Sequence, residues 1–199
     1  LVNRVAALGQ TACALTDHGV MYGVIDFYRA CKAKGIHPVI GCEVYLAPHS
    51  RFARSYLNGE WHSHLILLCE NMTGYRNLIH MVSLGFAEGF YMKPRIDMEL
   101  LRQHSEGLIC LSACLAGVIP RALAEGDMDG AYELCEQFLE IFDRDHFYLE
   151  VQDHGIEVQK KVNDGLYKLA EELNIGLGAT NDAHYLTKKD APIQDVLVC

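Results

Sequence analysis

Two apolar stretches of this sequence end in an acid and an imidazole close together. The stretch ACALTDHG ends with Asp17 and His18, and the stretch GLGATNDAHYL carries Asp182 and His184. Side chains two positions apart on a strand point to the same face, so Asp182 and His184 can bind one target together. If both stretches are strands of one sheet, the two acid and imidazole pairs are expected to meet.

Other residues of metal-binding type fall at the ends of further predicted strands. Glu43 lies in the apolar run HPVIGCEVYL, where a carboxylate is costly unless it is paired or bound to metal. Carboxylate, imidazole and thiolate together suit Zn²⁺, Mn²⁺ or Fe²⁺ better than Mg²⁺ or Ca²⁺. Several such ions at one site are typical of phosphoester hydrolysis. The predicted metal ligands are His18, Glu43, His64, Cys114, Asp182 and His184, and Asp182 and His184 are also predicted to be catalytic.

Each candidate also has a structural interpretation. His18 could cap the following helix, Glu43 could form a salt bridge, and Cys114 could be a small core residue. His64 could be a half-buried imidazole beside His62. His154, in VQDHG, is expected to orient a neighbour more readily than to bind metal.

The charge pattern gives no simple nucleic-acid surface. The net charge is −9, the isoelectric point is about 5.5, and no basic cluster exceeds KPR or KK. Bound divalent cations would offset this, because they can hold phosphate oxygens themselves. Lys93 and Arg95 could meet a phosphate, although a solvated loop is the favoured interpretation.

Strand-like and helical patterns alternate along the chain, which favours βαβ units and a parallel sheet. Helical spacing extends over about 20–31, 134–142 and 158–173, with Gly9, Gly35 and Asn174 as helix ends. The predicted strands are 12–16, 38–46, 64–69, 107–112, 147–151 and 175–180.

The sequence starts within a helical pattern and ends within another, so we expect a piece of a longer chain with at least one strand upstream. Six strands plus a missing one fit a closed or nearly closed α/β barrel, whose functional groups lie at the carboxyl ends of the strands. An open doubly wound sheet is the alternative, but neither G-x-G-x-x-G nor a P-loop is present.

The composition fits one globular domain over residues 1–199, with 50% hydrophobic residues and a mean hydropathy of +0.05. No apolar run approaches the roughly 20 residues of a membrane span, and the first residues do not resemble a signal peptide. The eight cysteines form no C-x-x-C pair, which predicts reduced thiols and a cytoplasmic location.

Five segments together resemble a known family over essentially the whole chain: CALTDHGVMYGVIDFYRACKAKGIHPVIGCEVYLAP, HLILLCENMTGYRNLIHMVS, GLICLSACLAGVIPRAL, FYLEVQDHG and ATNDAHYL. They are similar to the polymerase and histidinol phosphatase (PHP) domain at the amino terminus of bacterial DNA polymerase III alpha subunits. The resemblance implies a distorted (β/α)₇ TIM-like barrel with up to three divalent ions. It also implies that His18, Glu43, His64, Cys114, Asp182 and His184 match ligands of the family, and that a first strand with H-x-H and an acidic residue precedes this chain.

For function, the resemblance implies part of a DNA-directed DNA polymerase, with a metal-dependent phosphoesterase site that acts as a 3′ to 5′ exonuclease on the primer end. The expected partners are DNA, the rest of the alpha subunit and other replisome subunits, without a membrane. The alternatives are a catalytically silent, metal-stabilised module and, less favoured, a free-standing small-molecule phosphatase.

Overall fold

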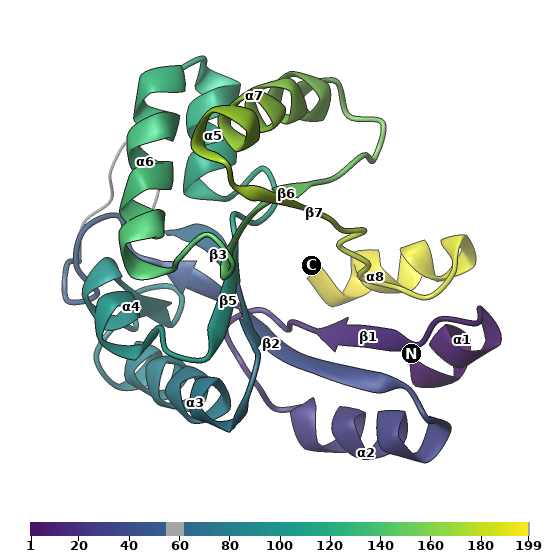
Figure 1. Ribbon diagram of the computed structural model, residues 1–199. Helices are drawn as coiled ribbons and strands as arrows, with labels where there is room; N and C mark the ends of the chain where they lie inside the picture. The colour runs from purple at the N-terminus through teal and green to yellow at the C-terminus, as the bar shows by residue number, and fades with distance from the viewer. Residues whose placement is uncertain (55–61, 199) are drawn as a thin grey trace.

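A strongly curved sheet forms the centre of the molecule in the computed structural model, which describes residues 1–54 and 62–198 (Figure 1). Its main path runs β1-β2-β3-β5-β6-β7, and β4 pairs with β2. β1 and β7 lie at the two ends of this path, so the described strands make an incompletely closed barrel. The strands are β1 (Ala12–Leu15), β2 (His37–Leu46), β3 (Ser63–Cys69), β4 (Arg95–Ile96), β5 (Leu108–Leu111), β6 (Phe147–Val151) and β7 (Gly176–Ala179).

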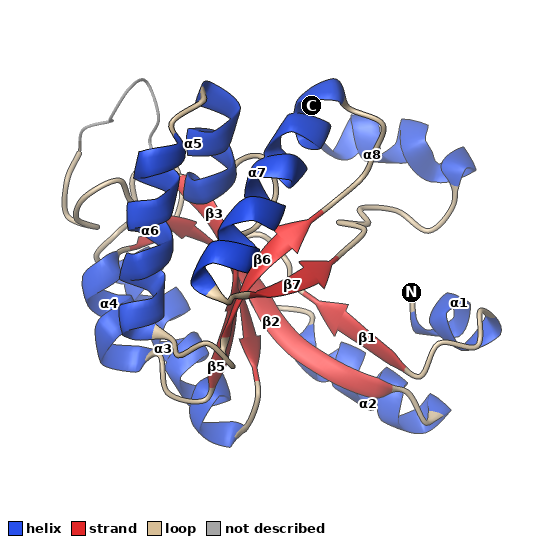
Figure 2. Cartoon of the chain, turned by 45° about the horizontal axis from the view of Figure 1, so that its top comes forward, coloured by secondary structure: helices blue, strands red, loops and turns tan. Residues whose placement is uncertain are grey.

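Helices surround the outside of this sheet (Figures 1 and 2). Among them, α2, α3 and α7 pack on strands of the sheet, and α6 packs mainly on α5 and α7. Their bounds are α1 (Val2–Ala7), α2 (Val24–Lys34), α3 (Met72–Ala87), α4 (Met98–His104), α5 (Val118–Glu125), α6 (Met128–Ile141), α7 (Glu157–Leu173), the 3₁₀ turn η1 (Lys188–Asp190) and α8 (Ala191–Val198). No helix in the described part of the chain is long and apolar enough to cross a membrane.

The predicted strands and helix ends agree with the structure within a few residues. Gly35 ends α2 with φ 67°, and Asn174 ends α7 with φ 52°, both in the left-handed conformation that terminates helices. β4 was not predicted, because a two-residue strand carries no periodicity that a sequence pattern can reveal.

The expectation of a parallel sheet is wrong for β3, which runs antiparallel to both β2 and β5. Parallel neighbours need a crossover, usually a helix, whereas antiparallel ones need only a loop. The described parts of the connection between β2 and β3, residues 47–54 and 62, contain no helix. The remaining neighbours on the main path, β1–β2, β5–β6 and β6–β7, are parallel as predicted.

The main core lies between the sheet and helices α3 to α7. Phe138 of α6 and Phe147 of β6 are both fully buried, and their rings stack with centroids 5.3 Å apart. A smaller cluster of Val2, Val5, Phe27, Cys31 and Ile36 joins α1 and α2 beneath β1. The cysteines at 13, 31, 42, 69, 110, 114 and 135 are free thiols in the structure, while Cys199 lies outside the described residues.

Candidate metal centre

The turn after β1 brings His18 beside Glu43 of β2. Beyond the regular strand, the Glu43 N–H donates to the Asp17 carbonyl (3.1 Å) and the Gly19 N–H donates to the Glu43 carbonyl (2.9 Å). Gly19 has φ 67°, and a Cβ there would lie 2.8 Å from Cε2 of Tyr45, so only glycine lets the turn pack this closely. As a result His18 Nδ1 lies 3.7 Å from Glu43 Oε1.

His64 reaches the same place from β3. It lies opposite Tyr45 in the antiparallel register, and its Nδ1 is 2.6 Å from Glu43 Oε1. Glu43 is only 4% exposed, so this contact compensates for a carboxylate buried in an apolar strand. Burial alone would lower the pKa of His64, but the hydrogen bonds to Cys114 and Glu43 outweigh it and raise that pKa to about 9.

Cys114 enters from the turn after β5. Its Sγ lies 3.7 Å from His64 Nδ1, and the His64 N–H donates to the Ala116 carbonyl at 3.0 Å, which ties β3 to this turn. Ala113, just before Cys114, has φ 65°, an unfavourable conformation for a residue with a Cβ. Strained backbone of this kind is frequent next to functional groups.

The segment after β7 carries the last two predicted metal ligands, Asp182 and His184. His184 Nε2 lies 3.3 Å from His18 Nε2, and His184 Nδ1 lies 2.9 Å from the Asp182 carbonyl and 3.7 Å from Asp182 Oδ1. Asp182 has φ 45°, which turns the chain sharply at this point. An unbroken series of contacts therefore joins the six predicted residues, in the order Cys114, His64, Glu43, His18, His184 and Asp182.

Three of these residues have the geometry of a metal site. One ligand atom each from His18, Glu43 and His64 lies within 4.8 Å of the other two. Two imidazoles and a carboxylate form a donor set that fits a zinc or other transition-metal ion, and Cys114 and His184 stand next to it. The alternative in which His18 caps a helix is wrong, because α2 begins after Gly23 and has no side-chain cap.

His154 does not contact the six residues directly. Its backbone N–H donates to Gln159 Oε1 (2.9 Å), which fixes the orientation of the Gln159 amide. The amide nitrogen of Gln159 therefore faces His154 Nδ1 (3.0 Å) and donates to it. Because Nδ1 accepts this hydrogen bond, the ring proton of His154 is on Nε2. That Nε2 then donates to the Asn181 carbonyl at 3.0 Å, immediately before Asp182. This arrangement fits the predicted orienting role.

The sequence analysis missed a buried polar network behind the site. Glu150 of β6 is 6% exposed, and its Oε1 accepts hydrogen bonds from Gln152 and Thr180. Its backbone N–H donates to Ser112 Oγ at 2.9 Å, next to the Cys114 turn. Glu150 interrupts the apolar run FYLEV just as Glu43 interrupts its own strand, so the same argument from burial would have identified it.

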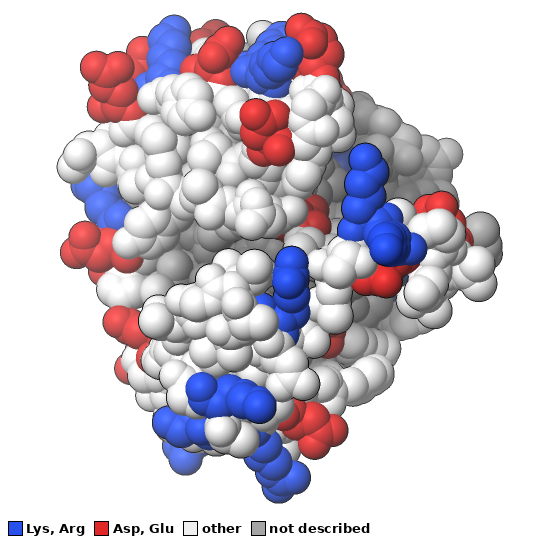
Figure 3. All heavy atoms as spheres, turned by 90° about the vertical axis from the view of Figure 1, so that its right-hand side faces the viewer, with Lys and Arg blue, Asp and Glu red and all other residues white. Residues whose placement is uncertain are grey.

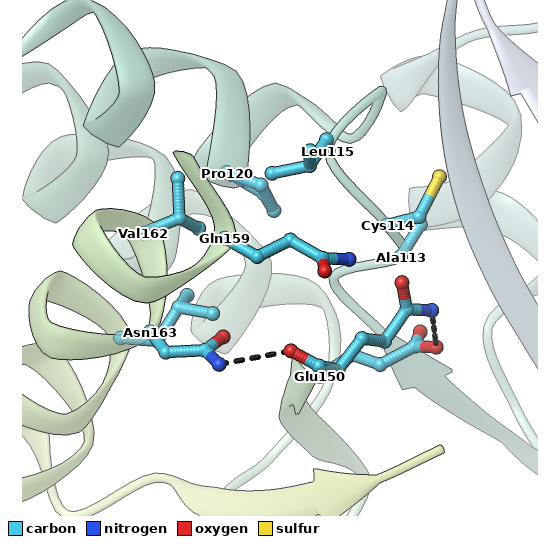
Figure 4. Close-up of a pocket in the computed structure, with 10 residues that line it drawn as sticks. Ala113, Cys114, Leu115, Pro120, Glu150, Gln159, Val162 and Asn163 are labelled. Carbon is cyan, nitrogen blue, oxygen red and sulfur yellow. Dashed lines mark hydrogen bonds between the residues drawn. The ribbon is translucent and has the colours of Figure 1, made fainter. Parts of the chain in front are cut away.

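This network borders a small cavity between α5, α7 and β6, with room for about one water molecule. Figure 4 shows the Gln159 amide directed toward Glu150 and Cys114, while the Cys114 sulfur points away from the lining. Glu150 Oε2 is buried here and has no hydrogen-bond partner among the residues that the structure describes. Burial raises the pKa of Glu150 above its ordinary value, and the charges of Asp182 and Glu43 add to the effect.

The comparisons with known proteins show the family and the fold of this chain. The PHP domain family profile matches residues 1–154, more than three quarters of the chain. The chain belongs to the PHP domain family. Within that family it is similar to DNA polymerase III subunit alpha of Treponema pallidum, with 50% identity over 100% of this chain and 17% of that protein. The corresponding subunit of Thermus aquaticus is 44% identical over 94% of this chain and 15% of its own length. This PHP chain thus spans about a sixth of the length of these relatives.

Two solved structures share the fold of this chain at low sequence identity. A candidate metal-dependent phosphoesterase from Bifidobacterium adolescentis superposes with a TM-score of 0.60 at 11% identity, over 99% of this chain and 88% of that one. An amidohydrolase from Chromobacterium violaceum, solved with bound sulfate and no metal, gives 0.55 at 13% identity, over 92% and 81%. These similarities confirm the expected TIM-like α/β fold.

Proposed function

We propose that this chain is the PHP region of a bacterial DNA polymerase III alpha subunit, and that its site is a metal-dependent phosphoesterase acting as a 3′ to 5′ exonuclease on mispaired primer ends. The observation that carries the proposal is the convergence of His18, Glu43 and His64, with Cys114, Asp182 and His184 in contact around them. The substrate is the primer strand, and the other partners are the rest of the alpha subunit and further replisome proteins in the cytoplasm.

The donor set fits the required metals. His18, Glu43, His64 and His184 would hold the ions, Cys114 would add a thiolate, and Asp182 would both bind metal and orient His184. Divalent ions at such a site activate a water molecule and stabilise the departing oxygen of a phosphodiester. The identity of the metal is proposed as Zn²⁺, Mn²⁺ or Fe²⁺, because a mixed nitrogen, oxygen and sulfur shell disfavours Mg²⁺ and Ca²⁺.

The test uses the full-length, purified alpha subunit on a 5′-labelled primer with a mispaired 3′ end, in Mn²⁺ or Zn²⁺ and without nucleoside triphosphates. Asp182→Asn is expected to abolish primer shortening, because it removes a negative charge at the site and with it the ion pair between the Asp182 side chain and His184. Asp164→Asn, on the exposed side of α7, is the matched control and should shorten the primer at the wild-type rate. Equal degradation by wild type and Asp182→Asn would refute the proposal.

A second function has one observation in its favour. The net charge is −9, and Figure 3 shows lysine and arginine mixed with aspartate and glutamate over the displayed face. A silent, metal-stabilised module that supports the polymerase needs no basic surface. In that case ligand variants would lower thermal stability and polymerase activity together, without any nuclease activity to lose. The small-molecule phosphatase is disfavoured because the relatives similar over the whole chain are much longer alpha subunits.

A further inference from the structure

The loop that precedes β4 is held rigidly next to the candidate metal centre. Arg95 is fully buried, and its guanidinium donates to the carbonyls of Gly89 (3.2 Å), Arg51 (3.3 Å) and Ala53 (2.7 Å). The prediction that Arg95 lies in a solvated loop is therefore wrong, because its buried guanidinium is hydrogen-bonded to three backbone carbonyls. A buried guanidinium with several backbone acceptors fixes the conformation of the segments that it joins.

The same loop packs on the turn that carries His18. A Cβ on Gly19 would lie 3.0 Å from Cγ of Pro94, so the Gly19 backbone and the Pro94 ring approach closely at this point. The Tyr91 N–H donates to the Lys93 carbonyl at 3.1 Å, and Met92 between them has φ 62°. Such a conformation costs about 1–3 kcal/mol and persists only where the surroundings enforce it. The backbone at Lys93 is thus held in one conformation beside the turn that carries His18.

At that place Lys93 is exposed, and its Nζ lies 5.4 Å from the ring centroid of Tyr45. Tyr45 is 6% exposed, and its ring centroid lies 5.5 Å from that of His64 and 6.2 Å from that of His18. The Tyr45 ring therefore lies close both to the Lys93 ammonium and to His18 and His64, two of the predicted metal ligands. A cation over a tyrosine face is attracted to the ring, which holds the flexible side chain over this spot.

We infer that Lys93 binds a phosphate of the primer strand next to the scissile linkage, and that Tyr45 is the residue that positions it. The inference rests on the proposed phosphodiester substrate and extends it to a substrate contact outside the metal ligands. A protein with a net charge of −9 needs a local cation to hold a polyanion, and lysine is a common phosphate-binding residue. Proteins that hold single strands use such cations along the backbone.

The kinetic test compares Lys93→Gln, Lys93→Arg and the control Lys34→Gln, which removes an exposed lysine from the last turn of α2. All are full-length subunits acting on the mispaired primer.

Lys93→Gln should raise KM about tenfold with little change in kcat, because it removes one charged contact made in the ground state and the transition state alike. The slope of log(kcat/KM) against log[salt] should become shallower by about 0.7. Lys93→Arg should recover most of the loss, and Lys34→Gln should match wild type.

A second measurement does not depend on turnover. Acetylation of lysines by an amine-reactive ester, mapped by mass spectrometry, is compared with and without a primer whose terminal linkages are hydrolysis-resistant phosphorothioates. Lys93 should be protected by the primer, and Lys34 should not. Elemental analysis of the Lys93→Gln protein should give the wild-type metal content, which separates loss of a phosphate contact from loss of the metal centre.

The outcomes separate this inference from the proposed function. If Asp182→Asn leaves degradation unchanged while Lys93 is protected, the nuclease proposal fails and the phosphate contact stands. An unprotected Lys93, or an unchanged KM in Lys93→Gln alongside an Asp182-dependent nuclease, overturns the contact.

Discussion

Tyr45 of β2 lies directly opposite His64 of β3 in an antiparallel register. His64 is the second residue of β3, and in a parallel strand the same position would lie at the opposite mouth of the barrel. The reversal places its imidazole at the carboxyl end of β2, 2.6 Å from Glu43. One change of strand direction therefore decides whether His64 belongs to the site.

Removing the carboxylate of Glu43 is expected to weaken metal binding, because its oxygen lies within 4.8 Å of both imidazole ligand atoms. After dialysis against a buffered chelator, the full-length Glu43→Gln protein should hold at least about tenfold less metal than the wild-type protein, as measured by elemental analysis. Glu140→Gln, an exposed change on α6, should retain the wild-type amount. Equal metal in both variants would remove Glu43 from the ligand set.

His154→Ala is expected to weaken metal binding without removing a ligand. It deletes the hydrogen bond to the Asn181 carbonyl that holds the segment before Asp182. Loss of such orienting partners typically costs about 10–100-fold in affinity or activity. Metal titration at constant pH checks this, and Glu171→Ala, an exposed change on α7, is the control. Unchanged affinity in His154→Ala would restrict the residue to a structural role.

Glu150→Gln is expected to stabilise the protein at neutral pH. The folded state raises the pKa of Glu150, so it binds the proton more tightly than the unfolded chain, and wild-type stability falls as pH rises above about 4.5. The amide carries no charge and offers a donor in place of the unpartnered Oε2. The gain should be about 1–3 kcal/mol at pH 7 and should vanish below pH 4.5.

The measurement is denaturant unfolding of both proteins across this pH range, with Glu157→Gln on the exposed start of α7 as the control. A stability difference that does not change with pH would show that repacking, and not the charge, is responsible.

Phe138→Ala is expected to cost about 3–5 kcal/mol, because the ring is fully buried and stacks on Phe147. Thermal unfolding should report the loss, while Phe138→Leu should recover a large part of it by filling most of the volume. A loss below about 1 kcal/mol in Phe138→Ala would mean that the core between α6 and β6 collapses to fill the cavity.

The sequence by itself determined most elements and the site candidates. Apolar runs interrupted by Glu43 or ended by Asp182 and His184 predicted both the strands and their polar ends, because a carboxylate in a buried strand needs a partner. Glycine and asparagine at 35 and 174 marked helix ends for a similarly local reason, since they tolerate positive φ.

Only the tertiary structure decided which of these groups meet. Strand direction is set by long-range pairing, so no local pattern revealed that β3 is reversed and that His64 faces Glu43. The same holds for Arg95 and Lys93, two residues apart in one short segment. Packing against distant carbonyls buries the first, and contact with Tyr45 leaves the second at the edge of the site.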